Sequence, residues 1–540
     1  MPFSAMPFFV MPFSVVPSPG VLMSTEAAAP PTTTQPRDKL MTTELVPEQV
    51  LPKVMSTFGL TATYVFIICW ITGSSVMATG GWNAIPMWVL GIILFLVPAG
   101  LVVAELGNLW PGQGGVYIWA YRTLNEPLAF FGGYLSWMPV ILNGAASPAI
   151  VVQLLLLAFH AEIGITLSVI LQLVILWIVI GLALAKLAAN QRVMNVSFIG
   201  YGVLTAVIFV AGALYAVRNG GPATEFVPRD ALIPNFAVGG FLFGTVLLYL
   251  VGVETPFNMG AEFLSVKRSA TRMIGWGSLA LIAIYLLTTL GTMMALPSAQ
   301  IDPVTGVIGM LDVAGFPGLM EVAAVVLALI VFVALVTYQI AYSRLIFVSG
   351  LERHLPRIFT HLNPRTRNPV TALLVQGALS STVMVALFSQ SSLANVTVYL
   401  TGALSVIWLV SGFFFFVPVV IARKKYADRY ANEDFWRIPG GMPAVYAVAI
   451  IGSLATMGGI YYSFATPWID VPASTWMTWL GSIVAVSLLV GVLVYVFGRR
   501  SAGQLSEPDA LAHLAVLELP EQRTPASAAP GAPPAAGDPA

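Results

Sequence analysis

Residues 249–258 read YLVGVETPFN and lie inside a long apolar run that begins near Phe236. Glycine weakens a helix, and proline removes a backbone hydrogen-bond donor. A polar side chain in lipid is costly unless it faces protein or water. Gly252, Glu254 and Pro256 therefore predict a membrane helix that is interrupted partway along its length.

The composition predicts a polytopic membrane protein of the all-α class. Hydrophobic residues make up 58% of the 540 residues and charged residues 9%, whereas a soluble domain carries about 25% charged residues. So few charges cannot cover a surface that faces water, so most of the surface must face lipid. The single cysteine, Cys69, excludes an intramolecular disulfide, and the four histidines lack metal-ligand spacing. We expect no metal and no cofactor.

Twelve apolar segments, each about long enough to cross ~30 Å of hydrocarbon, are expected between two polar tails. Residues 1–55 and 499–540 are predicted to be disordered tails, and residues 56–498 one transmembrane domain. The segments are expected near residues 58–81, 84–107, 127–158, 163–185, 194–217, 236–261, 273–296, 320–348, 369–389, 395–421, 443–466 and 476–498.

The positions of lysine and arginine predict that both termini are cytoplasmic, with the protein in the cell membrane. If the N-terminus lies inside, all but two of the 24 lysines and arginines fall in cytoplasmic loops or tails. The two exceptions are Arg218 and Arg229. Cytoplasmic loops of membrane proteins carry this excess of positive charge. The basic run at residues 423–425 is expected to touch anionic lipid, and it does not indicate nucleic acid.

A second interruption, ITGSS at residues 71–75, lies in the first apolar segment. Kinked helices with small residues for packing would explain either interruption alone. The two segments, however, open consecutive five-segment units of opposite topology, at about residues 56–217 and 236–421. Matching interruptions in inverted halves predict a transport site near the membrane midplane. There, freed N–H groups can bind a carboxylate, and freed carbonyl groups can bind an ammonium group.

Four motifs in order resemble those of the amino acid–polyamine–organocation (APC) permeases, over about residues 55–498. Residues 72–75 resemble the glycine/serine-rich break of that superfamily, with Gly-Ser-Ser in place of Gly-Ser-Gly. The second motif of the superfamily, A-x-L…P-x-x-GG-x-Y, resembles Ala104-Glu105-Leu106 followed by Pro111–Tyr117. The third, F-x-x-G-x-E, resembles Tyr249–Glu254. The fourth, S-R…L-P…NP-x-T-x-x-P-V, resembles Ser343-Arg344, Leu355-Pro356 and Asn363–Val370. Residues 97–100 and the stretch GGVYIW at residues 114–119 are similar to the glutamate/GABA antiporter-like branch.

This resemblance implies a LeuT-like fold of two inverted five-helix repeats, with two added helices at residues 443–498. It implies alternating access without ATP, and amino acids, amines or polyamines as substrates. Some proton-coupled relatives carry a lysine in the fifth segment. This chain has none there, and Tyr201 is the nearest replacement, which puts that coupling scheme in doubt.

Glu254 is the one acidic residue deep in an apolar segment. It either holds the interruption by bonding to the neighbouring backbone, or it is a proton-linked gate. We favour the gate because Asn or Thr could make a structural bond. Glu105, near Arg122, is either an interfacial charge or part of a cytoplasmic gate with Arg344. Glu254, Glu105 and Tyr201 are thus the coupling and gating candidates.

The candidates for substrate binding come from the two interruptions and from polar or aromatic residues in other segments. Hydrogen bonding between helices explains the polar residues equally well, and packing explains an aromatic lid. The candidates are Ile71, Thr72, Gly73, Ser74, Ser75, Asn143, Phe243, Val251, Gly252 and Tyr338.

Together these features predict a secondary active transporter of a zwitterionic amino acid, working as a proton symporter or an exchanger. No lysine or arginine falls at the centre of any segment. Glutamate/GABA exchange is one alternative, which the resemblance to the antiporter-like branch implies. Amine or polyamine antiport is another, because Glu254 offers an acid to a cation. A membrane enzyme would need a catalytic constellation such as HExxH, and none is present. The expected partners are the substrate, protons and the lipid bilayer, and a homodimer is left open.

Overall fold

The computed structural model describes residues 41–388, 393–469 and 471–502. Within them, all regular elements are helices, and the only β-structure is two isolated bridges. Ten helices in this part of the chain are long and apolar enough to cross a membrane. They coincide with ten of the twelve expected segments. The other two expected segments, near residues 58–81 and 236–261, are each divided into two short pieces.

The long helices have bounds that match their sequence signals. For example, Asn125 caps one helix by accepting a hydrogen bond from the Leu128 N–H at 2.9 Å. Another ends at Gly220 with a left-handed φ of 75°. The bounds are η1, α4, η2 and α5 (Gly81–Leu109), α7, α8 and α9 (Glu126–Ala158), α10 (Ile165–Ala183), α11 (Leu187–Asn219), α14 (Val266–Ala295), α16 (Pro317–Leu351), α17 (Val370–Phe388), α18 (Leu393–Ser411), α19 (Phe413–Lys425), α21 (Gly441–Ala465) and α22 (Ala473–Ala502).

The divided segments lie in the interior of this helix bundle. The first consists of α2 (Thr57–Ile68) and α3 (Gly73–Ala78), and the second of α13 (Phe236–Leu248) and the 3₁₀ helix η3 (Thr255–Glu262). Helices α14 and α16 pack against α2, and α13 packs against α21 and α18. Because side chains of α2 and η3 are buried almost without exception, protein rather than lipid surrounds both breaks.

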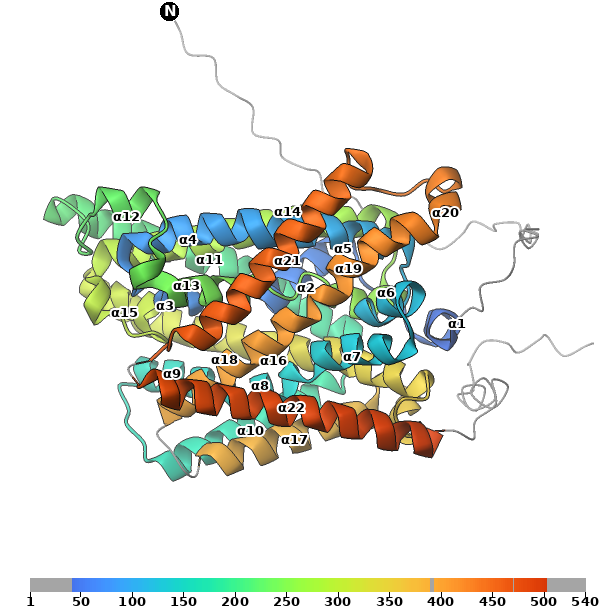
Figure 1. Cartoon of the computed structure of the whole chain (residues 1–540). Helices are drawn as coiled ribbons and strands as arrows, with labels where there is room; N and C mark the ends of the chain where they lie inside the picture. The colour runs from blue at the N-terminus through green and yellow to red at the C-terminus, as the bar shows by residue number, and fades with distance from the viewer. Residues whose placement is uncertain (1–40, 389–392, 470, 503–540) are drawn as a thin grey trace, which may run out of the picture. The chain divides into compact units, whose positions relative to one another are not determined.

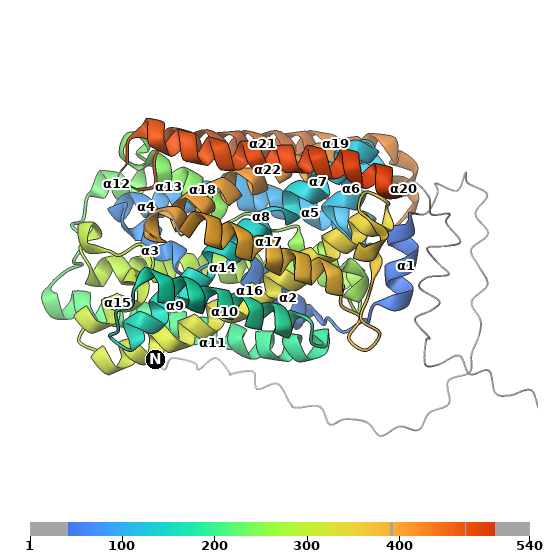
Figure 2. The ribbon, with the colours of Figure 1, turned by 90° about the horizontal axis from the view of Figure 1, so that it is seen from below.

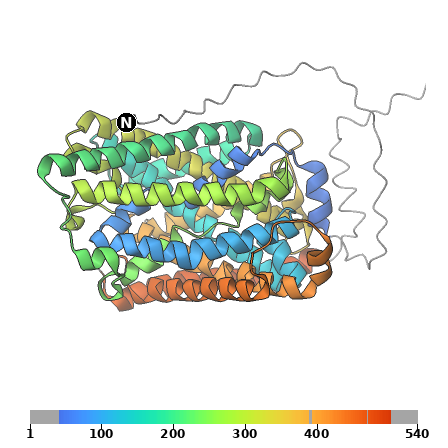
Figure 3. The same cartoon turned by 90° about the horizontal axis from the view of Figure 1, so that it is seen from above.

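Short helices mark the two ends of the bundle (Figure 1). Helices α1 (Thr42–Val50), α6 (Val116–Thr123) and α20 (Ala427–Asn432) lie at one end, here named the α1 end. Helices α12 (Pro228–Leu232) and α15 (Gly306–Val313) lie at the other, the α12 end. The views in Figure 2 and Figure 3 show the long helices running side by side between these ends.

The outer helices carry apolar side chains on their exposed faces. On α22, Val486, Leu489 and Phe497 are each more than half exposed. α16, by contrast, buries its side chains almost continuously from Ala334 to Leu351. An apolar exterior around a buried polar interior is what a hydrocarbon environment requires. The chain is therefore a multi-pass membrane protein.

The prediction of a disordered tail over residues 1–55 is wrong for residues 41–55. Residues 42–50 form α1, and Val46 and Leu51 bury their side chains against Phe347 and Leu362. The Val54 and Met55 N–H groups donate to the Glu262 carbonyl oxygen, both at 3.1 Å. Residues 1–40 and 503–540 lie outside the described residues, and α22 continues slightly past the expected boundary at residue 498.

Candidate functional site

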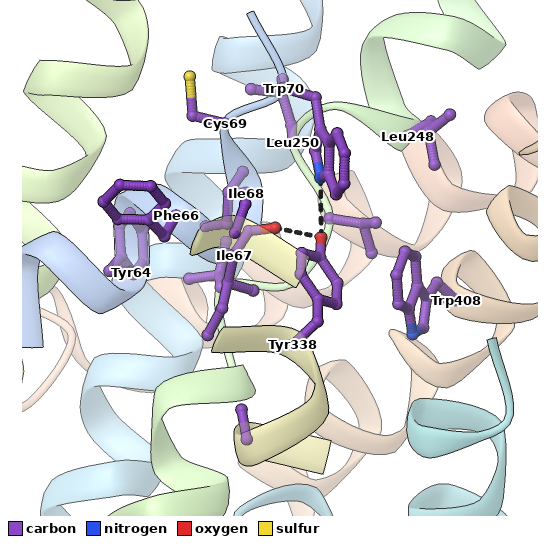
Figure 4. Close-up of a cluster of buried hydrophobic side chains, with 14 of the residues drawn as sticks. Tyr64, Phe66, Ile67, Ile68, Cys69, Trp70, Leu248, Leu250, Tyr338 and Trp408 are labelled. Carbon is purple, nitrogen blue, oxygen red and sulfur yellow. Dashed lines mark hydrogen bonds between the residues drawn. The ribbon is translucent and has the colours of Figure 1, made fainter. Parts of the chain in front are cut away.

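Three tyrosines stabilise the first break. α2 ends at Ile68, which leaves carbonyl groups that no longer have helical N–H partners. Tyr338 donates to the Ile67 carbonyl oxygen, Tyr285 to that of Ile68 at 2.8 Å, and Tyr201 to that of Cys69 at 2.8 Å. Tyr338 lies directly below Trp70 in Figure 4, and its hydroxyl also accepts from Trp70 Nε1 at 3.0 Å.

This arrangement gives Tyr201 a role that differs from the one expected for it. Its hydroxyl group is buried and occupied as a donor to the backbone of the break. In the structure Tyr201 thus supports the non-helical conformation at Cys69. Coupling through Tyr201 stays an untested prediction.

The N–H groups at the start of α3 are less available than the sequence suggests. Those of Gly73, Ser74 and Ser75 donate to the carbonyl oxygens of residues 70–72, at 2.7–3.0 Å. The N–H groups of Ile71 and Thr72 have no acceptor among the described residues. The free donors of the first break are therefore those of Ile71 and Thr72, immediately before the Gly-Ser-Ser motif.

The second break depends on a glycine with a left-handed backbone. Gly252 has a φ of 106°, which a residue with a side chain rarely adopts. The N–H groups of Leu250 and Val251 still reach the Leu247 carbonyl, at 3.2 and 3.0 Å. Beyond them, within the described residues, the N–H groups of Gly252 and Val253 find no acceptor. The second break thus also presents two free backbone donors.

The two breaks touch each other. A methyl group added at Gly73 would lie 2.6 Å from Cζ of Tyr249, and one added at Gly252 would lie 3.2 Å from a methyl carbon of Ile67. α3 packs against α13, and α2 packs against η3. The glycines therefore do more than weaken two helices, because they permit the interrupted segments to pack together.

A cavity of about 300 Å³ borders both breaks. Trp70 and Thr72 of the first break and Leu248 and Tyr249 of the second line it. Of the residues predicted to bind substrate, it is lined by Thr72, Asn143 and Tyr338. Asn143 is 5% exposed, and its Oδ1 atom has no hydrogen-bond partner among the described residues. The side chains that line the cavity include six aromatic rings and no Asp, Glu, Lys, Arg or His.

Other predicted residues lie beside the cavity but do not line it. The Ser74 and Thr288 hydroxyl oxygens are 2.6 Å apart, and Ser75 Oγ accepts from the Val307 N–H at 2.8 Å. Their hydroxyl groups thus hold α3 against α14 and α15. Ile71, Gly73, Val251 and Gly252 belong to the breaks but are likewise absent from the lining.

Phe243, the expected aromatic lid, does not face the cavity. Its ring packs on Phe236 and Tyr462, with centroids 5.6 and 6.0 Å away. Phe241 lines the cavity instead. Two residues along an α-helix differ by about 200° in direction, which explains why the neighbouring phenylalanine points elsewhere.

Glu254 lies in the protein interior between the second break and η3. Its side chain is 2% exposed, and Oε2 has no hydrogen-bond partner among the described residues. It is near enough to Tyr64, Tyr338 and Tyr342 to interact with them electrostatically. Tyr338 therefore lines the cavity and also interacts with the glutamate, which does not line it.

Glu105, expected to be either an interfacial charge or part of a cytoplasmic gate with Arg344, pairs with Arg423 instead of Arg344. Glu105 accepts from Nε and Nη2 of Arg423, both at 2.6 Å, and from the Tyr430 hydroxyl at 2.8 Å. Its Oε2 also accepts from the Ile438 N–H at 2.7 Å. Glu105 thus fixes the segment that follows α19 to α5. Arg122 pairs with Glu44 of α1 rather than with Glu105.

Arg344 instead belongs to a buried ion pair with Glu262. Its Nη2 atom donates to Glu262 Oε1 at 2.8 Å and to Asn368 Oδ1 at 2.9 Å. Asn368 Nδ2 donates in turn to the Ala183 carbonyl oxygen at 3.0 Å. Sequence reasoning missed Glu262. Its position at the end of the second broken segment, in the stretch MGAEFLSVKRS, is the signal that could have found it.

Comparison with known proteins identifies the family. The sequence model described as amino acid permease matches residues 53–498. The glutamate/gamma-aminobutyrate antiporter of Lactococcus lactis is 24% identical over 480 residues, covering 84% of this chain and 93% of that protein. In the described part of the chain, no group of three or more His, Cys, Asp or Glu residues could hold a metal ion.

Solved structures show the same fold. A manganese transporter of Eremococcus coleocola superposes with a TM-score of 0.53 at 14% identity, covering 84% of this chain and 95% of that one. The structure of MhsT in complex with L-phenylalanine superposes with a TM-score of 0.54 at 12% identity, covering 76% and 99%. These structures place the fold among the LeuT-like transporters. The chain belongs to the amino acid permease family of the APC superfamily, and it is a secondary transporter of amino acids or amines rather than an enzyme.

Proposed function

We propose that this protein transports a zwitterionic amino acid by alternating access, through a site between its two broken helices. The observation that carries the proposal is the cavity that both breaks border without any charged side chain among the described residues. A bound molecule with net charge would have no counter-charge there and would lose its hydration. A zwitterionic amino acid with an uncharged side chain is neutral overall, and backbone dipoles can bind its two charged groups.

The backbone supplies those dipoles. The free N–H group of Thr72, a residue that lines the cavity, suits a carboxylate, and the free N–H group of Ile71 lies next to it in the chain. On the second break, the carbonyl group of Tyr249, a residue that lines the cavity, suits an ammonium group, as does Asn143 Oδ1. This pairing follows the general pattern of transporters with interrupted helices.

The proposed architecture has two inverted repeats, over about residues 56–217 and 236–421, followed by two added helices. Each repeat opens with one broken segment. Counted this way, the ten long helices and the two divided segments make twelve crossings. The bounds proposed for the transport domain are residues 56–498, with α1 as an ordered part of the N-terminal segment.

In this proposal the α1 end faces the cytoplasm, with both termini inside and the protein in the cell membrane. The lysine and arginine distribution supports this orientation. The Glu262–Arg344 pair then acts as the inner gate, since it ties η3 to α16. On α16, Arg344 lies between Tyr338, which lines the cavity, and Phe347, which packs near α1. The gate must open when the site faces inward.

Glu254 is proposed as the coupling residue. It is buried, lacks a partner for Oε2 among the described residues, and does not line the cavity, whereas Tyr338, with which it interacts electrostatically, does. A proton on Glu254 would therefore act on the conformation of the second break rather than on the substrate directly. Coupling by exchange, without protons, is the competing scheme.

Glutamate/GABA exchange is the second candidate, because the antiporter of Lactococcus lactis is similar over most of this chain. Amine or polyamine antiport is the third, with Glu254 as the acid for a cation. Substrates of either kind bring a net charge, or a charged group far from the other one, into a cavity whose described lining has no charged side chain. That lining is why we rank them below a neutral amino acid.

Counterflow tests the proposal. Proteoliposomes that contain the full-length protein are loaded with one unlabelled amino acid or amine, and uptake of its labelled form is followed. We expect accelerated uptake for neutral amino acids and none for putrescine or lysine. Counterflow of glutamate against GABA, with none of neutral amino acids, would refute the proposal in favour of the second candidate.

A further inference from the structure

The connection between α21 and α22 reaches the cavity. Pro467, Trp468 and Ile469 contribute to its lining. These residues lie in the connection between the two added helices, outside both proposed repeats. Figure 1 shows this connection at the α12 end of the bundle, which the gate pair at the α1 end does not close. The lining of the cavity between the broken helices thus includes residues from outside both broken segments.

Packing holds Trp468 in place. Its ring centroid lies 6.0 Å from that of Trp476, with 34° between the ring planes. Trp476 is fully buried, donates from Nε1 to the Ser463 carbonyl oxygen at 2.9 Å, and packs on Tyr399 at 5.5 Å. A ring fixed in this way loses little conformational entropy when a ligand packs against it.

The chemistry of the surrounding wall is apolar and aromatic. Pro467 and Ile469 flank Trp468, and Phe241, Val304 and Val398 line the same cavity. An aliphatic or aromatic side chain gains by leaving water for such a wall. A side chain with a charged end would leave water without a partner, at high cost.

We propose that the α21–α22 connection forms the subsite for the substrate's side chain, that Trp468 selects its size, and that the transported amino acids have bulky, uncharged side chains. This inference rests on the proposed function of amino acid transport. It assigns the α-ammonium and α-carboxylate groups to the breaks, and the rest of the molecule to the added helices.

The test compares a large and a small substrate. Initial rates of phenylalanine and alanine uptake are measured with the full-length protein in proteoliposomes, and the ratio of maximal rate to KM is taken for each. Trp468→Ala should lower this ratio about tenfold or more for phenylalanine and by less than about twofold for alanine, because a pocket discriminates by the apolar contacts it makes.

Two further variants separate contact from folding. Trp468→Phe keeps an aromatic ring and removes an Nε1 atom that has no acceptor among the described residues, so it should retain most phenylalanine transport. Trp479→Ala is the matched control. Trp479 packs on the same Tyr399, at 5.7 Å, but it is 41% exposed and does not line the cavity. Its loss should leave both substrates unaffected.

An equal loss of alanine and phenylalanine transport in Trp468→Ala would overturn the inference, and so would no loss of either. If that variant does not fold, Trp468→Leu gives the same comparison. Should the wild-type protein move no neutral amino acid at all, the proposed function fails together with the inference. If the wild-type protein transports alanine and phenylalanine, but the Trp468→Ala substitution does not change the ratio of the two, only the inference fails.

Discussion

Replacing Glu262 by glutamine should open the α1 end of the protein. The carboxylate is the only acidic partner of Arg344 within the described residues, and both side chains are at most 1% exposed. Glutamine keeps the size of the side chain but removes its charge. The guanidinium group then stays buried with Asn368 as its remaining side-chain partner from another element.

The magnitude follows from the burial. Removing one partner of a buried ion pair costs roughly 3–5 kcal/mol. This cost applies to the closed state, because opening lets water reach Arg344. Since about 1.4 kcal/mol corresponds to a tenfold change, the ratio of open to closed protein should rise by roughly a hundredfold to a few thousandfold.

The sole cysteine of the chain provides the assay. Cys69 is buried and lies at the first break, so a membrane-impermeant maleimide added on the α1 side should label it faster when that end opens. Glu433→Gln is the matched control, because Glu433 pairs with Arg429 at the same end while 45% exposed. An exposed pair contributes only about 0–1 kcal/mol. Labelling of Glu262→Gln within twofold of the wild type would refute the gate.

Three further predictions concern the breaks. Glu254→Gln should still perform counterflow but lose the response of uptake to a pH gradient; an unchanged response would exclude Glu254 from coupling. Gly73→Ala forces a methyl group against the Tyr249 ring, so transport should fall at least tenfold, whereas Gly181→Ala, with nothing within 4 Å, should transport normally. Tyr338→Phe removes two hydrogen bonds to the first break and should destabilise the protein by about 1–3 kcal/mol, seen as earlier thermal unfolding in detergent; an unchanged transition would contradict the bracing role.

The breaks themselves could be predicted from the sequence because their signals are local. Threonine, glycine and serine interrupt the first apolar run, and glycine, glutamate and proline interrupt the other. The structure confirms interruptions at both places. Thr72 and Asn143 were likewise expected at the site, since polar residues deep in apolar segments need protein or water around them. These inferences need only the chain neighbours of each residue.

The partners of the breaks could not be predicted, because they come from distant parts of the chain. Tyr201 and Tyr285 reach the first break from helices more than a hundred residues away. Glu105 pairs with Arg423, which is distant in sequence. Its position near the end of an apolar segment does not specify which helix packs beside it. Phe243 was expected to cover the cavity, but its ring packs on Tyr462 of α21. The sequence does not specify which face of α13 packs against α21.

Substrate binding tests the central claim most directly. Purified full-length protein would be incubated with a labelled neutral amino acid such as phenylalanine, and unlabelled compounds would compete for it at two pH values. The proposed charge-free site between the breaks predicts saturable binding, with competition by neutral amino acids and none by putrescine, lysine or glutamate. Competition by putrescine or glutamate, or the absence of saturable binding of any neutral amino acid, would contradict the claim.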